Sequence, residues 1–530
     1  MPHHRTITSK GRRYKQLVES KWNPEKKSSE VHVIRHLGPV IQKNGKEILK
    51  PSPLKVDSVD KAYPIGTLAI YWKLAEELKI YDSIAKCFEF NDDDTATGIV
   101  ILALNQLIGR KSLTKLGSWV TNSPLERWMN LNQEQLTKDY FLSALDAIST
   151  IEYDFNKSCS FSIQNNLSKS WRKVIGNEPE KYFFYQDVTR IKWNGNESFW
   201  AEKGYGTQKG RPHIGFGLVV SKDNYMPIIG YPVRGSHHDT TTIRETISNL
   251  TRLTFNDITL VWDRGFVSKV NIKYALNNKF HVLSAGPKTS NEVIKWITKY
   301  SDSYIERREN ILQLSKGRGI YFKEYIGTLY GNKCKIVIVL DPEKRNHTRT
   351  ERDLILQQLE IEKSRKKIAK LKKQLKPIVV SSRGRRGYEI VKKEEDLARK
   401  SDGRSLFFCT DIDVSGEDII KTYLQKDHIE KAFRLLRGNA CLTPVRYQLP
   451  GRVEAYLSVV NFIAYELIAA VLWKLKKYKL DIGFENLMEE AEKIYEVEMT
   501  SKGEKVYRWT HMTKNVEKLF KPYNITKLQT

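Results

Sequence analysis

The spacing of apolar residues changes along the chain, and the changes mark different predicted architectures. Residues 1–60 contain two runs that alternate apolar and polar side chains, Tyr14–Ser20 and Glu30–Gly38, and this alternation predicts a β-hairpin. Residues 61–175 carry apolar residues at helical spacing instead. We therefore expect a hairpin-bearing arm followed by a helical region.

From about residue 180 the pattern becomes that of strands. Four runs read as strands and a helix follows the last of them: 181–187, 213–221, 225–233, 257–263 and then the helix 271–279. Strand, long hairpin, strand and helix is the opening order of an RNase H-like α/β fold. The prediction is such a core, with a mixed five-stranded sheet and flanking helices.

Residues 286–405 interrupt this pattern with further strands and one long helical segment, Glu351–Lys376, which Pro377 ends. Leu354, Ile361, Ile368 and Leu375 recur every seven residues. The polar residues between them favour a long surface helix, and a coiled coil is the alternative. The core pattern resumes with a strand at 405–411 and a long helix at 416–438.

A run of nineteen residues, Ala455–Trp473, is apolar enough to resemble a membrane span. It contains one charge, Glu466, and a charge near the middle of a bilayer costs several kcal/mol. A buried core helix is therefore the preferred interpretation, and we expect no membrane contact.

Composition narrows the classes of function. The chain has 530 residues, 89 Lys and Arg against 62 Asp and Glu, a net charge of +27 and 40% hydrophobic residues. That apolar share excludes wholesale disorder, and the positive excess predicts a polyanionic partner, nucleic acid first and an anionic membrane surface second. The five cysteines form no C-x-x-C pair and no apolar run opens the chain, so we expect a cytoplasmic protein.

The positive charge is unevenly distributed. Residues 1–60 carry +7 and residues 286–400 carry +14, whereas residues 61–177 have 13 cations and 13 anions. Non-specific phosphate contact is therefore expected in the first two segments. If the helical region binds DNA, it must do so through a local face.

Three acids, two at the ends of predicted strands and one within a predicted helix, are candidates for metal-assisted phosphoryl transfer. Asp187 ends the first strand, Asp263 ends the fourth strand, and Glu430 lies in the helix after the interruption. Such transfer needs carboxylates that hold two divalent metal ions about 4 Å apart. The fold would have to bring these acids together.

The helix that carries Glu430 presents a polar stripe. At about 100° per residue, Tyr423, Lys426, Glu430 and Arg437 fall within an arc of about 60°, opposite the apolar positions. This arrangement suits a metal ligand flanked by phosphate-binding groups. The alternative is a solvated helix face with ordinary ion pairs.

These motifs together resemble the DDE transposases of prokaryotic insertion sequences, in the subgroup with a Y-x2-R-x3-E-x6-K signature and a β-rich insertion. Here the signature reads Tyr423-x2-Lys426-x3-Glu430-x6-Arg437, with the two basic residue types exchanged. Further similar stretches are YQDVT at 185–189, WDRGF at 262–266, GSHHD at 235–239 and the N-terminal hairpin. Asp263 and Glu430 are 167 positions apart, as an inserted domain requires.

The resemblance implies an enzyme that binds the terminal inverted repeats of its element, frees 3′-OH ends and joins them to target DNA. It implies two Mg²⁺ ions, or Mn²⁺, held by Asp187, Asp263 and Glu430. It further implies DNA contacts by Tyr423, Lys426, Arg437 and Arg264, and a homodimer on double-stranded DNA, associated with the nucleoid. The alternatives are an inactive, transposase-derived DNA-binding protein and a structure-specific nuclease with the same core.

The implied domain layout has six segments. They are a basic arm (1–60), a helical end-binding domain (61–177), the first part of the core (178–285), an insertion domain with a basic helix (286–405), the second part of the core (406–475) and a C-terminal tail for oligomerisation (476–530).

Several other residues have functional and structural interpretations. Some relatives stack a flipped base on an aromatic side chain of the insertion, and Trp296, Tyr388 or Phe407 could do so here, although packing is the simpler role. His237 to Asp239 fit a loop better than a metal site, and Asp411 and Asp413 fit a turn better than metal ligation. The glycines at 204–210 lack the G-K-[ST] of a P-loop.

Overall fold

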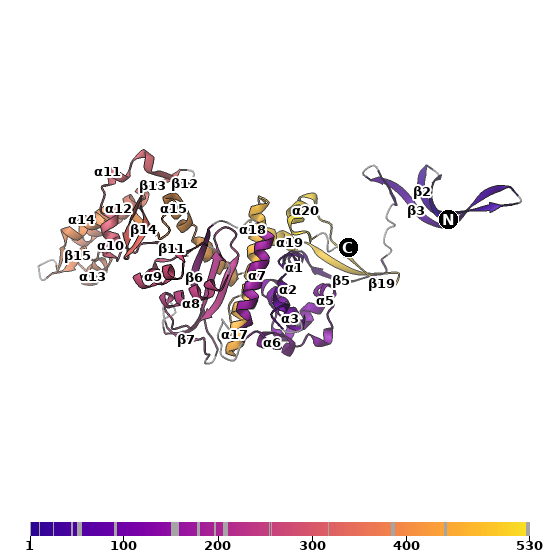
Figure 1. Ribbon diagram of the computed structural model, residues 1–530, viewed down its shortest axis with the longest axis horizontal. Coiled ribbons are helices and arrows are strands. Elements are labelled where there is room, and N and C mark those ends of the chain that lie inside the picture. Colours follow the sequence, from indigo (N-terminus) through magenta and orange to yellow (C-terminus); the bar gives the residue numbers. More distant parts are fainter. Residues whose placement is uncertain are drawn as a thin grey trace. The chain divides into compact units, whose positions relative to one another are not determined.

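The computed structural model describes most of the chain. It leaves undescribed residues 1, 10, 25, 44–45, 50–55, 89–92, 150–157, 177–180, 196–197, 205–209, 254, 256, 316, 383–386, 439–441 and 526–530, and the side chains of 43, 46–49, 239 and 428. The chain forms two compact units: residues 1–64 with 494–511, and residues 65–493 with 512–528. Figure 1 labels their elements.

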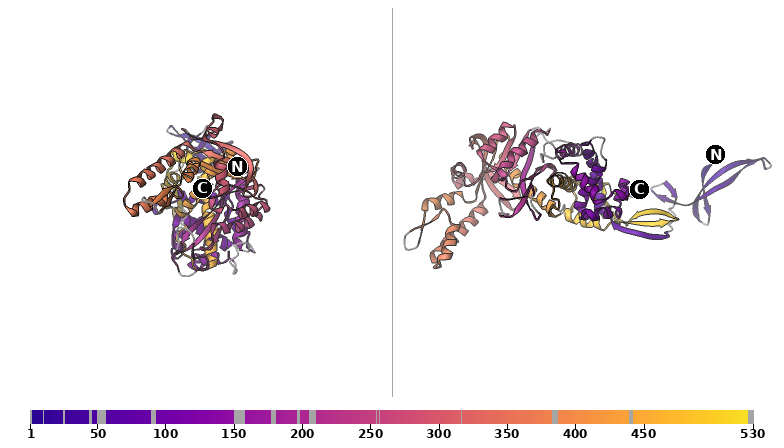
Figure 2. Two further views of the ribbon diagram at one scale, coloured as in Figure 1. Left: turned by 90° about the vertical axis from the view of Figure 1, so that its left-hand side faces the viewer. Right: turned by 90° about the horizontal axis from the view of Figure 1, so that it is seen from below.

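The first unit is built from strands. An antiparallel sheet has the order β1-β2-β3-β4, formed by β1 (His3–Ser9), β2 (Arg12–Asn23), β3 (Ser28–Lys43) and β4 (Lys46–Leu49). The pairing of β2 with β3 confirms the predicted hairpin. A second sheet, which the sequence did not predict, has the order β19-β18-β5, formed by β5 (Ser58–Pro64), β18 (Tyr495–Ser501) and β19 (Glu504–Trp509). Figure 2 shows the yellow C-terminal strands beside indigo β5.

The second unit opens with helices, as predicted. They are α1 (Gly66–Glu77), α2 (Ile80–Ala85), α3 (Asp93–Leu104), the π-helix η1 (Asn105–Gly109), α4 (Leu113–Thr121), α5 (Leu125–Met129), α6 (Lys138–Asp146) and α7 (Cys159–Ile175). Every residue of α3 from Thr95 to Leu104 is buried, because α2, α6 and α18 (Asn461–Lys477) surround it. This region therefore has a core of its own that α18 completes.

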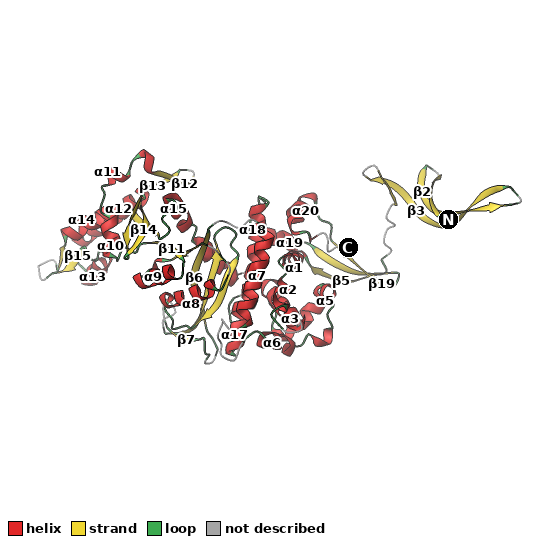
Figure 3. Cartoon of the chain, viewed as in Figure 1, coloured by secondary structure: helices red, strands yellow, loops and turns green. Residues whose placement is uncertain are grey.

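A mixed sheet follows, and it confirms the predicted α/β class and the four predicted strands. Its central part has the order β9-β8-β6-β10-β11, formed by β6 (Tyr182–Lys192), β8 (Pro212–Ser221), β9 (Pro227–Val233), β10 (Ile258–Trp262) and β11 (His281–Ala285). β10 and β11 run parallel to β6, whereas β8 runs antiparallel to it and β9 antiparallel to β8. Helices α8 (Asp239–Thr251) and α9 (Lys269–Asn277) complete the crossovers (Figure 3).

The sheet has ten strands rather than the five expected. Beyond β11 it continues through β17 (Arg404–Cys409), β14 (Asn332–Leu340), β13 (Arg318–Leu329) and β12 (Ile311–Ser315), and the short β7 (Glu202–Lys203) pairs with β8. β17 pairs antiparallel with both β11 and β14. An open strand edge leaves backbone N–H and C=O groups unpaired. β17 pairs with the edge of β11 on one side and with the edge of β14 on the other, so it joins the interrupting segment to the central strands.

The prediction of one continuous helix over residues 351–376 is wrong. The chain forms α12 (Pro342–Ile361) and α13 (Arg365–Gln374), and the Glu362 side chain accepts hydrogen bonds from the backbone N–H of Lys363 and Ser364 at the break. The two helices close a small core of Leu359, Leu375, Ile378 and Val379. In the predicted seven-residue stripe, Leu354 is 53% and Ile361 78% exposed, so it forms neither a long helix nor a coiled-coil seam.

The rest of this segment surrounds that small core and the sheet edge. Its elements are α10 (Asn291–Ile297), α11 (Asp302–Ile305), β15 (Val379–Ser381), β16 (Tyr388–Ile390) and α14 (Lys392–Ser401). Two ion pairs tie it to β17 and the residues before it: a buried pair between Arg352 and Asp402, and a half-buried pair between Arg404 and Asp302.

The helix predicted over 416–438 is also divided. α15 (Gly416–Leu424) ends before α16 (Asp427–Gly438), and the backbone N–H of Lys426 donates to the carbonyl of Tyr423 three residues back instead of continuing the α-helical ladder. The remaining helices are α17 (Pro450–Ala455), the π-helix η6 (Tyr456–Val460), α18, α19 (Phe484–Glu492) and α20 (Lys514–Phe520).

The apolar run is a buried helix, as expected. The continuous helical segment Pro450–Lys477 is long and apolar enough to cross a membrane. Its most apolar 18-residue window has a mean hydropathy of 1.8, and 94% of this window is buried inside the protein. Gln164 of α7 connects this helical segment to the sheet. Its Nε2 donates to the carbonyl of Gly230 in β9 and to the carbonyl of Ser458 in η6, at 2.6 Å each. α18 itself packs against both α1 and β9, so it links the helical region to the sheet.

Candidate active site

Asp187 and Asp263 lie on neighbouring parallel strands at equivalent positions. Tyr185 of β6 is in register with Val261 of β10, and each acid follows two residues later. Adjacent strands are about 4.8 Å apart, so the two carboxylates leave the sheet side by side.

A buried polar network holds the two strands in place on the opposite face of the sheet. Trp262 Nε1 donates to Gln186 Oε1 at 2.9 Å, and Gln186 Nε2 donates to Thr246 Oγ1 of α8 at 2.7 Å. Gln186 and Trp262 each precede an acid, so strand alternation directs their side chains away from it. The sequence patterns did not single out Gln186 or Thr246, because each residue type alone carries no chemical signature.

Local backbone contacts orient each carboxylate. The Val188 N–H donates to Asp187 Oδ1 at 2.8 Å. Asp263 caps the short 3₁₀ helix Arg264–Phe266 and accepts from the Arg264 N–H at 2.7 Å. Both acids keep further oxygen lone pairs for other partners.

Lys426 brings Glu430 to this pair. Its Nζ lies 3.1 Å from Asp263 Oδ1 and 4.0 Å from Glu430 Oε1. Burial lowers the pKa of Lys426, but attraction to Asp263, a hydrogen bond to it and the field of Asp187 outweigh burial and raise that pKa. The Lys426 side chain is 15% exposed, while those of Asp263 and Glu430 are 49% and 59% exposed. The Lys426 ammonium thus lies between Asp263 and Glu430, and the charge of Asp187 also acts on it.

The other predicted DNA-contacting residues surround the acids. Burial and the charge of Asp263 raise the pKa of Tyr423, and a hydrogen bond with Arg264 opposes them. Arg437 donates to the hydroxyl of Thr189, two residues beyond Asp187 on β6. Because the helix is divided, Tyr423 lies on α15, and the predicted single polar stripe is wrong in geometry although its residues converge.

A second acidic group lies at the opposite end of the same strands. Oxygen and nitrogen atoms of Asp257, His281 and Asp411 lie within 4.8 Å of one another. Lys181 Nζ is 2.6 Å from Asp411 Oδ2 and 3.9 Å from Asp257 Oδ2. We interpret this group as an ion-pair cluster. The Asp413 N–H donates to Asp411 Oδ1 at 3.0 Å, which is the expected turn contact.

The remaining candidates have packing or loop roles. Phe407 is 5% exposed and contacts the Tyr423 ring with 4.9 Å between centroids, and Tyr388 packs against the small core of α12 and α13. Trp296 is half-buried beside Tyr325. His238 caps α8, the Asp239 side chain lies outside the described residues, and so do residues 205–209 of the glycine-rich stretch.

Comparisons with known proteins find similarity to solved structures. No family model and no curated protein matches the sequence. A solved structure, the piggyBac transposase synaptic complex with hairpin DNA, is similar with a TM-score of 0.37 and 10% sequence identity, over 81% of this chain and 79% of that one. A TM-score of this size does not establish a shared fold, so the evidence for function lies in the side chains described above.

Proposed function

We propose that the protein is a DDE-type DNA transposase with an RNase H-like core. The observation that carries this proposal is the convergence of Asp187, Asp263 and Glu430 around Lys426. In the strand order β9-β8-β6-β10-β11, β8 runs antiparallel to the other four strands, and this arrangement supports the RNase H-like assignment. Asp187 lies within β6, and Asp263 directly follows β10, the neighbouring strand of that order.

The donor set fits divalent magnesium. Three carboxylates offer hard oxygen ligands, and the position of the Lys426 ammonium beside Asp263 and Glu430 supports the binding of a cation there. We propose that Asp187, Asp263 and Glu430 hold two Mg²⁺ ions, for which Mn²⁺ can substitute. When bound, the ions would neutralise charge on the attacking and leaving oxygens of a phosphodiester.

The basic residues around the acids would orient the DNA strand. Arg437 lies beside β6 and Arg264 beside Tyr423, so both can donate to non-bridging phosphate oxygens. Lys426 would exchange its carboxylate contacts for a phosphate contact once metal neutralises the acids. In this proposal the enzyme binds the inverted repeats of its own element as a homodimer, frees 3′-OH ends and joins them to target DNA.

The test uses the DNA that flanks the reading frame as substrate. With Mg²⁺, the wild-type protein should nick end-containing duplexes and join them to a target plasmid. Asp187→Asn, Asp263→Asn and Glu430→Gln should each abolish nicking and leave end binding intact, because each removes a metal ligand and no phosphate contact.

Asp257→Asn is the matched control, because it neutralises an acid at the other end of the same strands. It should nick at the wild-type rate. Nicking by any of the three site variants would reject their assignment. Nicking without joining would instead favour a nuclease with the same core.

A further inference from the structure

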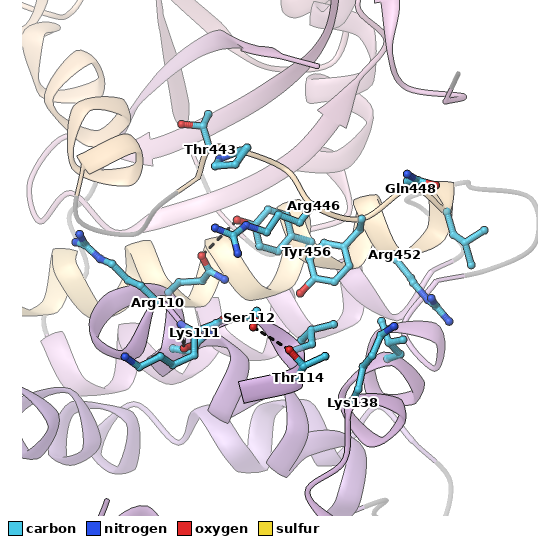
Figure 4. A pocket seen from close by; sticks show the side chains of 17 residues that line it. Arg110, Lys111, Ser112, Thr114, Lys138, Thr443, Arg446, Gln448, Arg452 and Tyr456 are labelled. Atoms are coloured by element: carbon cyan, nitrogen blue, oxygen red, sulfur yellow. Dashed lines mark hydrogen bonds between the residues drawn. The ribbon is translucent and has the colours of Figure 1, made fainter. Parts of the chain in front are cut away.

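A basic pocket of about 550 Å³ lies between the helical region and the segment that follows α16. Figure 4 shows its side chains, which come from η1, α4 and α6 on one side and from residues 443–456 on the other. Of its seventeen lining residues none is acidic, and five are cationic: Arg110, Lys111, Lys138, Arg446 and Arg452. We call this site the basic pocket.

Contacts of two of its arginines fix the shape of the pocket. Arg452 donates to both carboxylate oxygens of Asp146, with Nε and Nη2 each at 2.7 Å. This pair fixes the start of α17 against the end of α6. Arg110 Nη2 donates to the carbonyl of Gly438 at 3.2 Å, which orients the guanidinium toward the end of α16. The pocket therefore has a positive surface held in a defined shape.

The five cations of the pocket form a local cluster that the net charge of the surrounding helical region does not explain. Residues 61–177 contain equal numbers of Lys plus Arg and Asp plus Glu, 13 of each. Arg110, Lys111 and Lys138 of this otherwise neutral region nevertheless line one cavity and face Arg446 from the other side. A concave site with one sign of charge favours a polyanion over neutral ligands.

The pocket also presents aromatic and hydroxyl groups. The rings of Tyr447 and Tyr456 lie 5.0 Å apart between centroids. Burial raises the pKa of Tyr447 to about 12, so its hydroxyl stays protonated and can donate a hydrogen bond near neutral pH. Tyr456 is 3% exposed and its hydroxyl donates to Gln106 Oε1, so its ring supports the wall of the pocket while Tyr447 can offer its hydroxyl to a ligand.

The position of the pocket relates it to the candidate active site. Gly438, which Arg110 contacts, is the last residue of α16, and Glu430 lies eight positions earlier on the same helix. At 1.5 Å per residue these positions are about 12 Å apart along the helix axis. Duplex DNA rises about 3.4 Å per step, so the separation corresponds to three or four nucleotides, roughly.

We propose that the basic pocket binds a backbone phosphate of the DNA strand whose reacting bond lies at Asp187, Asp263 and Glu430. This inference rests on the proposed function, because it takes DNA as the substrate. The pocket would fix the register of the strand a few nucleotides from the bond that breaks. It is also the local face through which the neutral helical region contacts DNA.

The test compares two double variants of the full-length protein. Lys111→Gln/Arg446→Gln removes two exposed cations of the pocket, and Lys115→Gln/Lys173→Gln removes two exposed cations of the helical region outside it. End-duplex binding is measured by fluorescence anisotropy in EDTA over a range of salt concentrations. The pocket variant should bind end DNA about tenfold more weakly than wild type, and the slope of log K against log salt concentration should be smaller by about 2. The control variant should keep the wild-type affinity and slope.

A methylphosphonate scan locates the contact. A neutral linkage should weaken wild-type binding at one or two positions, three to four nucleotides from the nick site, roughly, and should not weaken binding by the pocket variant there. Equal binding by both double variants, or a scan identical for wild type and pocket variant, would overturn the proposal. Saturating DNA should restore nicking by the pocket variant.

Free phosphate is the other source of the same chemistry. If inorganic phosphate or thymidine monophosphate at millimolar concentration binds in a pocket-dependent way while DNA binding is unaffected by the variant, the site is one for small anions and the proposal fails. Failure of the proposed function is distinguishable, since it appears as a wild-type protein that binds end DNA but never nicks it.

Discussion

Glu466 is predicted to make the stability of the protein fall as pH rises. This carboxyl lies on α18 with no exposed surface, and neither oxygen has a hydrogen-bond partner among the described residues. Burial raises its pKa from the ordinary value of 4.5 to about 8. Between those values the folded protein keeps a proton that the unfolded chain has lost, so rising pH favours unfolding.

The size of the effect follows from the gap between the two pKa values. At about 1.4 kcal/mol per pKa unit, the stabilisation lost between pH 4.5 and 8 is at most about 5 kcal/mol. At pH 5.5 only about 1.4 kcal/mol of it has been lost. Glu466→Gln keeps the shape of the side chain and cannot ionise, so its free energy of unfolding relative to wild type should rise by about 3 kcal/mol between pH 5.5 and pH 8.

Urea denaturation followed by fluorescence at both pH values measures this difference. Glu489→Gln on α19 is the control, because Glu489 is exposed and its replacement should give the same small difference at both pH values. A Glu466→Gln difference that does not change with pH would show that the carboxyl ionises in the folded protein, and the reasoning from burial would be wrong.

Two further predictions concern the candidate active site. Lys426→Ala removes the ammonium that lies 3.1 Å from Asp263 and that would compete with a metal ion for this carboxylate. Mn²⁺ binding measured by calorimetry should therefore tighten severalfold while nicking slows, and an unchanged Mn²⁺ affinity would contradict this competition. Gln186→Leu breaks the contacts to Trp262 and Thr246, so it should lower the free energy of unfolding by about 1–3 kcal/mol and slow nicking more than it weakens end binding; a loss of stability with a wild-type nicking rate would show that the network does not position the acids.

The sequence predicted those elements whose signals are local. Alternation and period placed the hairpin of β2 and β3, the helical region and the strands that carry Asp187 and Asp263, because side-chain periodicity depends on neighbouring residues alone. The same patterns placed the buried helix α18. The acids could be named because each one ends a predicted strand or lies on a polar face of a predicted helix. Asp263 does follow β10, whereas β6 continues to Lys192, so the prediction that Asp187 ends its strand is wrong.

Features that depend on distant partners could not be predicted. β5 pairs with β18, more than 430 positions away, and nothing in either segment specifies the other. The helix break before Asp427 is similar, since the residues around it have ordinary helical propensity. There Lys426 leaves the helical ladder and its side chain meets Asp263, a residue that only the folded sheet brings near.

The double pairing of β17 has a mechanical consequence. This strand is hydrogen-bonded along both edges, and α15 and α16 follow it in the chain, with Lys426 in the break between them and Glu430 on α16. A ladder of backbone hydrogen bonds resists shear, so β17 would transmit a force applied to the basic segment 286–400 to the central strands. If DNA binds that segment as proposed, tension in it would reach Asp187 and Asp263 through the sheet, but Glu430 only across the break at Lys426.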